Sequence, residues 1–250
     1  VLQLVNDVLR KQDKPQYILF HELAIPPLWF VQIAEKCHAN RVSLIAGVDY
    51  ITDTETKTCT NEIWMSLVSL KDNFPELVFI SEKKNHLAYV EENDLRTKYG
   101  YRPAEIAVNE REHSIIAHGN FAFSTLICSE LLEMSKRCRL IGKVDALFVV
   151  SWNQDRETFD EIIRSAATDI HAYVVFCNNN EFGDSRVRVP RKERWARDVV
   201  EVRGGDEPYY VIGTLEIQEL RKFQSHANPN LLKDAKFKPL PMGFVIDEAR

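Results

Sequence analysis

The stretch at residues 124–133, Ser-Thr-Leu-Ile-Cys-Ser-Glu-Leu-Leu-Glu, predicts an apolar strand that ends directly before a helix. Cys128 lies where the strand gives way to the helix. A cysteine in such an elbow projects its sulfur from the rim of a sheet, close to the unpaired N–H groups of the helix. A lone cysteine is more often an inert, buried apolar side chain. The stretch therefore indicates a nucleophile only if partner residues lie elsewhere in the chain.

Strands and helices alternate on both sides of this elbow. Some segments repeat apolar residues with helical spacing, and others are short apolar runs typical of buried strands. Alternating strands and helices, with hairpins among them, predict an α/β domain of two mixed sheets packed together with helices outside. The predicted helices cover 1–10, 27–39, 129–140, 157–171 and a short segment ending at 223, and the predicted strands cover 16–20, 42–50, 62–70, 77–80, 113–118, 121–127, 146–150, 173–177 and 209–217, with a turn at 71–75.

Composition sets the limits of the fold. The chain has 250 residues, 45% of them hydrophobic, with 9 Gly and 10 Pro, which is typical of a globular protein with a sizeable core. No linker divides it, so we expect one domain over 1–224 and a tail at 225–250 that extends from the core. No apolar run approaches the ~18 residues of a membrane helix, and nothing at Val1 resembles a signal peptide.

Net charge and cysteine content limit the classes of binding partner and the cellular compartment that we expect for this protein. The net charge of -5 argues against nucleic acid as an electrostatic partner, and the one basic stretch, 186–197, is interpreted as a solvated loop. The five cysteines form no Cys-x-x-Cys pair and, like the seven histidines, are scattered. This pattern favours reduced thiols over disulfides or a zinc site. We therefore expect a cytoplasmic protein that uses neither a metal nor a cofactor.

Two upstream residues would supply what a thiol nucleophile needs. Glu22 follows a predicted buried strand, and Lys84 follows the strand at 77–80. Taken alone, each is more often a solvated surface charge. A free thiol has a pKa near ~8.5, so a nucleophile at neutral pH needs a base or a cation beside it. A carboxylate supplies the base, and an ammonium stabilises both the thiolate and an oxyanion.

These residues resemble the Glu-Lys-Cys triad of the nitrilase (carbon–nitrogen hydrolase) superfamily in order and spacing. The matching strings are Phe-His-Glu-Leu around Glu22, Lys-Lys-Asn-His-Leu around Lys84 and Leu-Ile-Cys-Ser-Glu around Cys128. No single string is very specific, but their correct order over residues 1–224 is much stronger support. Further matches are Asn61, Glu130, Ser151-Trp152-Asn153, Arg164 with Ala167 and Asp169, the strand at 173–178, and Gly183-Asp184-Ser185 with Pro190.

The resemblance implies a fold and a chemistry. The fold is an α-β-β-α sandwich, and such domains usually form homo-oligomers. Cys128 would attack the carbon of an amide or a nitrile, with Glu22 as general base. Lys84 and the backbone N–H of Ser129 would hold the oxyanion. Loss of the amine or ammonia would leave a thioester intermediate on the cysteine, which water activated by Glu22 then hydrolyses.

The resemblance also implies residues around this triad. Glu92 is the best match for a second glutamate that orients Lys84, with Glu91 as a close rival. Trp152 and Asn153 would line the pocket of a small-molecule amide or nitrile substrate. An equally simple interpretation makes Trp152 a core residue.

Some positions depart from the family pattern. His21 stands where a Pro commonly precedes the first glutamate, Ser129 where an aromatic residue usually follows the nucleophile, and Leu132 where an Arg is frequent. These changes bear on the substrate more than on the chemistry. The family also begins with a strand before the first helix, whereas this chain opens inside that helix. We therefore expect a fragment of a longer polypeptide, with a further domain fused upstream.

Three alternatives remain open from the sequence. The chain could be a nitrilase-fold module for assembly or sensing in a larger protein, as in some defence reverse transcriptases. It could be an acyltransferase that passes the acyl group to an amine instead of water. It could also be an unrelated α/β binding protein in which the three residues are incidental.

Overall fold

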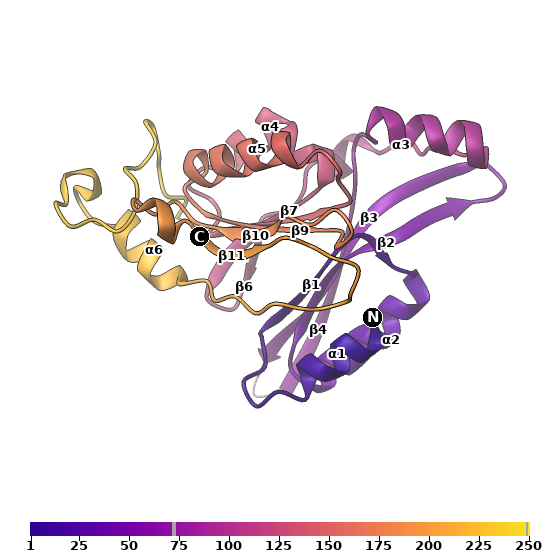
Figure 1. The fold of residues 1–250 in the computed structure, drawn as a ribbon, viewed down its shortest axis with the longest axis horizontal. Helices are drawn as coiled ribbons and strands as arrows, with labels where there is room; N and C mark the ends of the chain where they lie inside the picture. Colours follow the sequence, from indigo (N-terminus) through magenta and orange to yellow (C-terminus); the bar gives the residue numbers. More distant parts are fainter. Residues whose placement is uncertain (72–73, 249) are drawn as a thin grey trace.

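The computed structural model describes residues 1–71, 74–248 and 250, which form two mixed β-sheets packed face to face (Figure 1). The first sheet has the order β1-β2-β3-β4, with β5 paired to β3, and the second has the order β11-β10-β9-β8-β7-β6. The strands of the first sheet are β1 (Tyr17–Ile25), β2 (Ser43–Asp53), β3 (Thr58–Lys71), β4 (Phe74–Lys83) and β5 (Arg102–Pro103), and those of the second are β6 (Ile116–His118), β7 (Phe121–Ile127), β8 (Ala146–Ser151), β9 (Tyr173–Asn178), β10 (Ser185–Arg188) and β11 (Asp198–Val202).

Helices cover the outer faces, so the described residues form the expected α-β-β-α sandwich (Figure 1). The pair α1 and α2 lies on the first sheet, and α4 and α5 lie on the second. The helices are α1 (Leu2–Leu9), α2 (Pro27–Ala39), α3 (Tyr89–Asp94), α4 (Met134–Arg139), α5 (Arg156–Asp169) and α6 (Ile217–Gln224), with a π-helical turn η1 (Leu95–Tyr99) and short 3-10 turns η2 (Val108–Glu110), η3 (Cys128–Leu132), η4 (Arg194–Ala196) and η5 (Pro229–Leu231).

The core between the sheets is aromatic near its centre. The ring of Tyr17 on β1 lies 6.1 Å from those of Phe123 on β7 and Phe148 on β8. On the other side of the second sheet, Phe159 of α5 packs on Phe176 of β9 with ring centroids 5.6 Å apart. Burial of large side chains on both faces of this sheet explains why its central strands read as unbroken apolar runs.

Most predicted elements are confirmed, and two are wrong in detail. The helix predicted at 129–140 is broken into η3 and α4, because Glu133 between them adopts an extended conformation (φ −72°, ψ 107°). The strand predicted at 209–217 has no strand pairing. The edge of this sheet is formed instead by β10 and β11. The predicted turn at 71–75 contains residues 72–73, which lie outside the described residues.

The basic stretch at 186–197 is a solvated loop only in its second part, where residues 192–195 are exposed. Its first part is β10, in which Arg186 and Arg188 are 5% and 7% exposed. Arg186 pairs with Asp160 of α5, and Arg188 Nη1 lies 2.5 Å from Asp198 Oδ2 on the neighbouring strand. Each guanidinium is thus neutralised by a carboxylate and becomes part of the packing between β10, β11 and α5.

The tail at 225–250 does not simply extend from the core. Phe237 is 3% exposed and packs against Phe223 of α6, with ring centroids 5.4 Å apart. Arg250 Nη2 lies 2.5 Å from Oδ1 of Asp145, a carboxylate with no exposed surface. In Figure 1 the tail loops past α6 and returns to the second sheet. Aromatic and charged contacts therefore anchor the tail on the domain.

No helix in the described ranges combines the length and the apolar character that crossing a membrane requires.

Candidate active site

Cys128 lies at a strained elbow between β7 and η3. Its φ is +48°, in the left-handed region that residues other than glycine rarely adopt. The residue is 8% exposed, and the hydroxyl of Ser151, at the end of β8, donates to its Sγ at 3.3 Å. The carboxyl ends of the parallel strands β7 and β8 thus bring a thiol and a hydrogen-bond donor together.

Glu22 reaches the same place from the first sheet. The pairing of β1 with β2 shifts register between Phe20 and Ile25, and Leu23 has a φ of +54°. This irregularity turns Glu22, 3% exposed, into the interior. Gly47 on β2 makes room for it, because a Cβ at Gly47 would lie 2.4 Å from the Cα of Glu22.

Lys84 lies between two carboxylates. It follows β4 directly and is 3% exposed. Its Nζ is 2.8 Å from Glu22 Oε1 and 2.6 Å from Glu91 Oε2. Burial opposes the charged ammonium, but the two carboxylates outweigh this effect and raise the pKa of Lys84. The lysine is therefore a fixed positive charge at neutral pH.

The second glutamate beside Lys84 is Glu91, and not the expected Glu92. Both are on α3, but adjacent helical residues point about 100° apart, so only one can face the lysine. Glu91 also accepts hydrogen bonds from Tyr50 and Asn61, each at 2.8 Å. Glu92 faces solvent and pairs with Arg96 at 2.7 Å.

Asn61 links the two carboxylates. Its Nδ2 donates to Glu22 Oε1 at 2.7 Å and to Glu91 Oε1 at 2.8 Å. Lys84 and Asn61 thus form two parallel bridges between Glu22 and Glu91. From the sequence, Asn61 is identified only as a match to the family, and Tyr50 is given no function. A tyrosine at the end of a predicted strand carries no signal of such a contact.

Trp152, Asn153 and Ser129, which were expected to line the substrate pocket, lie beside this cluster and make different contacts. Trp152 is 47% exposed, so it is not a core residue, and its backbone N–H donates to Glu22 Oε2 at 2.8 Å. The side chain of Asn153 donates to the carbonyl of Asp155 at 2.9 Å, within its own loop. Ser129 is partly exposed and follows Cys128 in η3.

The thiol of Cys128 holds its proton in the resting protein. Burial and the negative charge of Glu22 raise its pKa to about 12, although Lys84 and Ser151 act in the opposite direction. The backbone N–H of Trp152 also lies against the sulfur. A thiol in this state reacts only if a base removes its proton, and the nearby carboxylate of Glu22 can do so.

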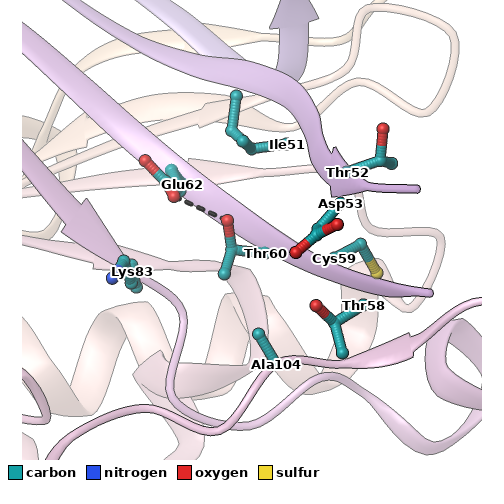
Figure 2. A pocket seen from close by; sticks show the side chains of 9 residues that line it. All are labelled: Ile51, Thr52, Asp53, Thr58, Cys59, Thr60, Glu62, Lys83 and Ala104. Carbon is teal, nitrogen blue, oxygen red and sulfur yellow. Dashed lines mark hydrogen bonds between the residues drawn. The ribbon is translucent and has the colours of Figure 1, made fainter. Parts of the chain in front are cut away.

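A small pocket lies at the start of β3 and is lined from both faces of that strand. Successive residues of a strand face opposite sides. Glu62 and Lys83, which pair in register, therefore turn away from the cluster that their neighbours Asn61 and Lys84 form. They line a pocket of 260 Å³ together with Thr60, whose hydroxyl donates to Glu62 at 2.6 Å, and with Cys59 (Figure 2).

Within the described residues, no group of three or more His, Cys, Asp or Glu side chains could hold a metal ion.

Comparison with solved structures shows what this fold resembles. The chain is similar to an amidase of the nitrilase superfamily from Nesterenkonia AN1, with a TM-score of 0.55, 17% sequence identity, and coverage of 88% of this chain and 86% of that one. It is also similar to a CN-hydrolase superfamily protein from Xanthomonas campestris with an arsenic adduct in its active site, with a TM-score of 0.62, 13% identity, and coverage of 89% and 84%.

Another structure of the Nesterenkonia amidase shows covalent addition of the acetamide moiety of fluoroacetamide at the active-site cysteine. It matches this chain with a TM-score of 0.55 and 15% identity, over 82% of this chain and 81% of that one. The sequence matches no protein-family profile and no curated protein. At these identities the comparisons establish the fold, which is that of the nitrilase superfamily.

Proposed function

We propose that this protein, which has the fold of nitrilase-superfamily amidases, hydrolyses the carbon–nitrogen bond of a small amide through a thioester on Cys128. One observation carries the proposal. A buried carboxylate, a buried ammonium and a buried thiol, from Glu22, Lys84 and Cys128, converge where the carboxyl ends of strands from both sheets meet. The first two come from one sheet and the third from the other, so only the folded domain assembles them.

In the first half of the reaction, Glu22 takes the proton of Cys128 as the sulfur attacks the carbonyl carbon. A carbon–sulfur bond forms, and the carbonyl π electrons move onto oxygen. The ammonium of Lys84 and the backbone N–H of Ser129 stabilise this oxyanion. Collapse of the tetrahedral intermediate breaks the carbon–nitrogen bond, and Glu22 returns its proton to the leaving ammonia or amine.

In the second half, Glu22 takes a proton from water, which attacks the thioester carbon. The second tetrahedral intermediate uses the same oxyanion contacts. Its collapse breaks the carbon–sulfur bond, and the proton on Glu22 returns to the sulfur as the carboxylic acid leaves. One base therefore serves both halves, because the proton it takes is returned in each of them.

Glu91 positions Lys84 in both halves of the reaction. Lys84 donates to Glu22 and to Glu91, so its Nζ is held from two sides while the third donor stays available for the substrate oxygen. Asn61 holds the two carboxylates at a fixed separation. Such preorganisation matters because the groups need not rearrange as charge develops.

The substrate class we favour is the short aliphatic amides, with nitriles as a second choice. Structures of the similar Nesterenkonia amidase carry butyramide or the acetamide moiety of fluoroacetamide. We further propose that the protein acts in the cytoplasm as a homo-oligomer.

The test measures ammonia release from acetamide, propionamide and butyramide by wild type, Cys128→Ala and Cys138→Ala. Cys138 is an exposed thiol on α4 and serves as the matched control. We expect turnover in the wild type and in Cys138→Ala, and none in Cys128→Ala. Hydroxylamine added to the assay reports the thioester, because it intercepts the acyl group as a hydroxamate in place of the acid. Full turnover in Cys128→Ala would exclude the thioester mechanism.

A further inference from the structure

A second buried cluster of charges lies behind the elbow and takes no part in the proposed reaction. It runs from Glu82 on β4 through His113 to Glu130 in η3 and ends at Lys136 on α4. The first three side chains are 7%, 4% and 0% exposed. Charged groups are rarely buried unless each has a partner, and here positive and negative charges alternate.

His113 is the centre of this cluster. Its Nδ1 lies 3.0 Å from Glu82 Oε2, and its Nε2 lies 3.0 Å from Glu130 Oε2. Both ring nitrogens therefore lie within ion-pair distance of a carboxylate, an arrangement that favours the protonated, positively charged imidazole. Burial opposes that charge, but Glu130 and Glu82 outweigh it and raise the pKa of His113 to about 9.

Glu130 in turn holds the two segments that carry the reacting groups. Its Oε2 accepts from the backbone N–H of Ile127 at 2.9 Å, and its Oε1 accepts from that of Asn85 at 3.1 Å. Ile127 immediately precedes Cys128, and Asn85 immediately follows Lys84. One carboxylate therefore ties the backbone beside the thiol to the backbone beside the ammonium.

The other end of the cluster fixes the strand that leads to the lysine. Glu82 lies two residues before Lys84 on β4 and accepts from the hydroxyl of Thr125 on β7 and from the backbone N–H of Ser114 at 2.7 Å. His113 thus joins two carboxylates that each span from the first sheet to the second.

We propose that His113 is a positioning residue, which through Glu130 and Glu82 sets the separation of Cys128 from Lys84. It touches no reacting atom in the proposed mechanism. Without its charge, two carboxylates would remain buried near each other, and one would have to take up a proton or turn away. The backbone N–H groups of Ile127 and Asn85 would then lose a common acceptor. The proposal rests on the proposed function for its effect on turnover, but not for its effect on the backbone.

The test compares hydrogen exchange by mass spectrometry in wild type, His113→Gln and His171→Gln. His171 is the matched control, since it is also fully buried and hydrogen-bonded, to Lys238 and Gln224, but it belongs to the far end of the domain. We expect exchange in peptides spanning 83–88 and 124–133 to be roughly tenfold faster in His113→Gln, as loss of a buried acceptor permits. In His171→Gln both peptides should exchange as in the wild type.

Unchanged exchange in both peptides of a folded His113→Gln variant would overturn the proposal, as would acceleration of only one of them. If His113→Gln does not fold, the wild type is compared at pH 7 and pH 10, after correction for intrinsic exchange, with the α2 peptide as internal reference. The proposal then requires selective acceleration of the same two peptides at pH 10. None of these measurements uses an amide substrate, so a protein that hydrolyses no amide would refute the proposed function and leave this result standing.

Where turnover is detected, a kinetic measurement adds a second readout. Misplacement of the reacting groups lowers kcat roughly tenfold or more with little change in KM, because substrate binding is not what His113 supports. A rise in KM at constant kcat in His113→Gln would contradict the positioning role.

Discussion

Glu91 and Glu92 are neighbours in the chain, yet only Glu91 lies against Lys84, with 2.6 Å between Oε2 and Nζ, whereas Glu92 pairs with Arg96 at the surface. The helix α3 therefore divides two chemically identical side chains between the interior and solvent. This difference offers a test in which composition, length and charge of the variants are the same.

We predict that Glu91→Gln loses activity and Glu92→Gln does not. Replacing Glu91 removes a charge that holds Lys84, so kcat should fall by roughly 10²-fold, a size typical of one lost electrostatic contact in an active site. Glu92→Gln should retain wild-type kcat, because an exposed ion pair contributes little. Amide turnover by the two variants decides the assignment. Equal losses in both, or a larger loss in Glu92→Gln, would reverse it.

Gly47 is predicted to be essential for placing Glu22. A methyl group there would lie 2.4 Å from the Cα of Glu22, so the backbone of β1 must move in Gly47→Ala. A displacement of about 1 Å can lower a rate by roughly 10²-fold. The control is Gly213→Ala, in which the new methyl would meet the side chain of Val200, away from the site. Kinetics of both variants, with unfolding midpoints, test this. Wild-type kcat in a folded Gly47→Ala variant would show that β1 adapts without moving Glu22.

Ser151 is predicted to help ionise the thiol. Its hydroxyl donates to Cys128 Sγ at 3.3 Å, and a hydrogen bond of this kind stabilises the thiolate. In Ser151→Ala we expect alkylation of Cys128 by iodoacetamide at pH 8 to slow by roughly three- to tenfold, corresponding to about 1 kcal/mol. The control is Ser66→Ala, since Ser66 is buried and its hydroxyl has no hydrogen-bond partner in the part of the chain that is described. An alkylation rate in Ser151→Ala that matches both the control and the wild type would argue against this role.

The sequence was sufficient for the fold class, because the alternation of strands and helices depends on local patterns. The helix at 27–39 has the same bounds in the structure, since Pro27 suits a first helical turn and apolar residues recur at helical spacing behind it. Glu22, Lys84 and Cys128 each follow a strand that the apolar pattern reveals. Their meeting across two sheets is a property of the fold, which the pattern indicates only through the family resemblance.

The sequence was insufficient where the outcome depends on long-range pairing. Residues 209–217 include Tyr-Tyr-Val-Ile, which has high strand propensity, but a strand also needs a neighbour to pair with. Arg186 and Arg188 look solvated in the sequence because the carboxylates that they contact most closely, those of Asp160 and Asp198, lie at least ten residues away. The choice between Glu91 and Glu92 depends on the rotation of α3, which no local signal fixes.

The stability of the folded protein is expected to depend on pH through His113. His113 is faced by Glu82 from β4 and Glu130 from η3, with Lys136 of α4 beyond Glu130, and its pKa is raised to about 9 from an ordinary value near 6.5. A group whose pKa is higher in the folded state stabilises that state fully below its unfolded pKa, and the stabilisation is lost as pH rises through the folded pKa. The free energy of unfolding of wild type should therefore exceed that of His113→Gln most at pH 6, and this difference should shrink by about 1–3 kcal/mol by pH 9.5. Urea titrations of both proteins at these two pH values measure it, and a difference independent of pH would mean that His113 is neutral in the folded protein.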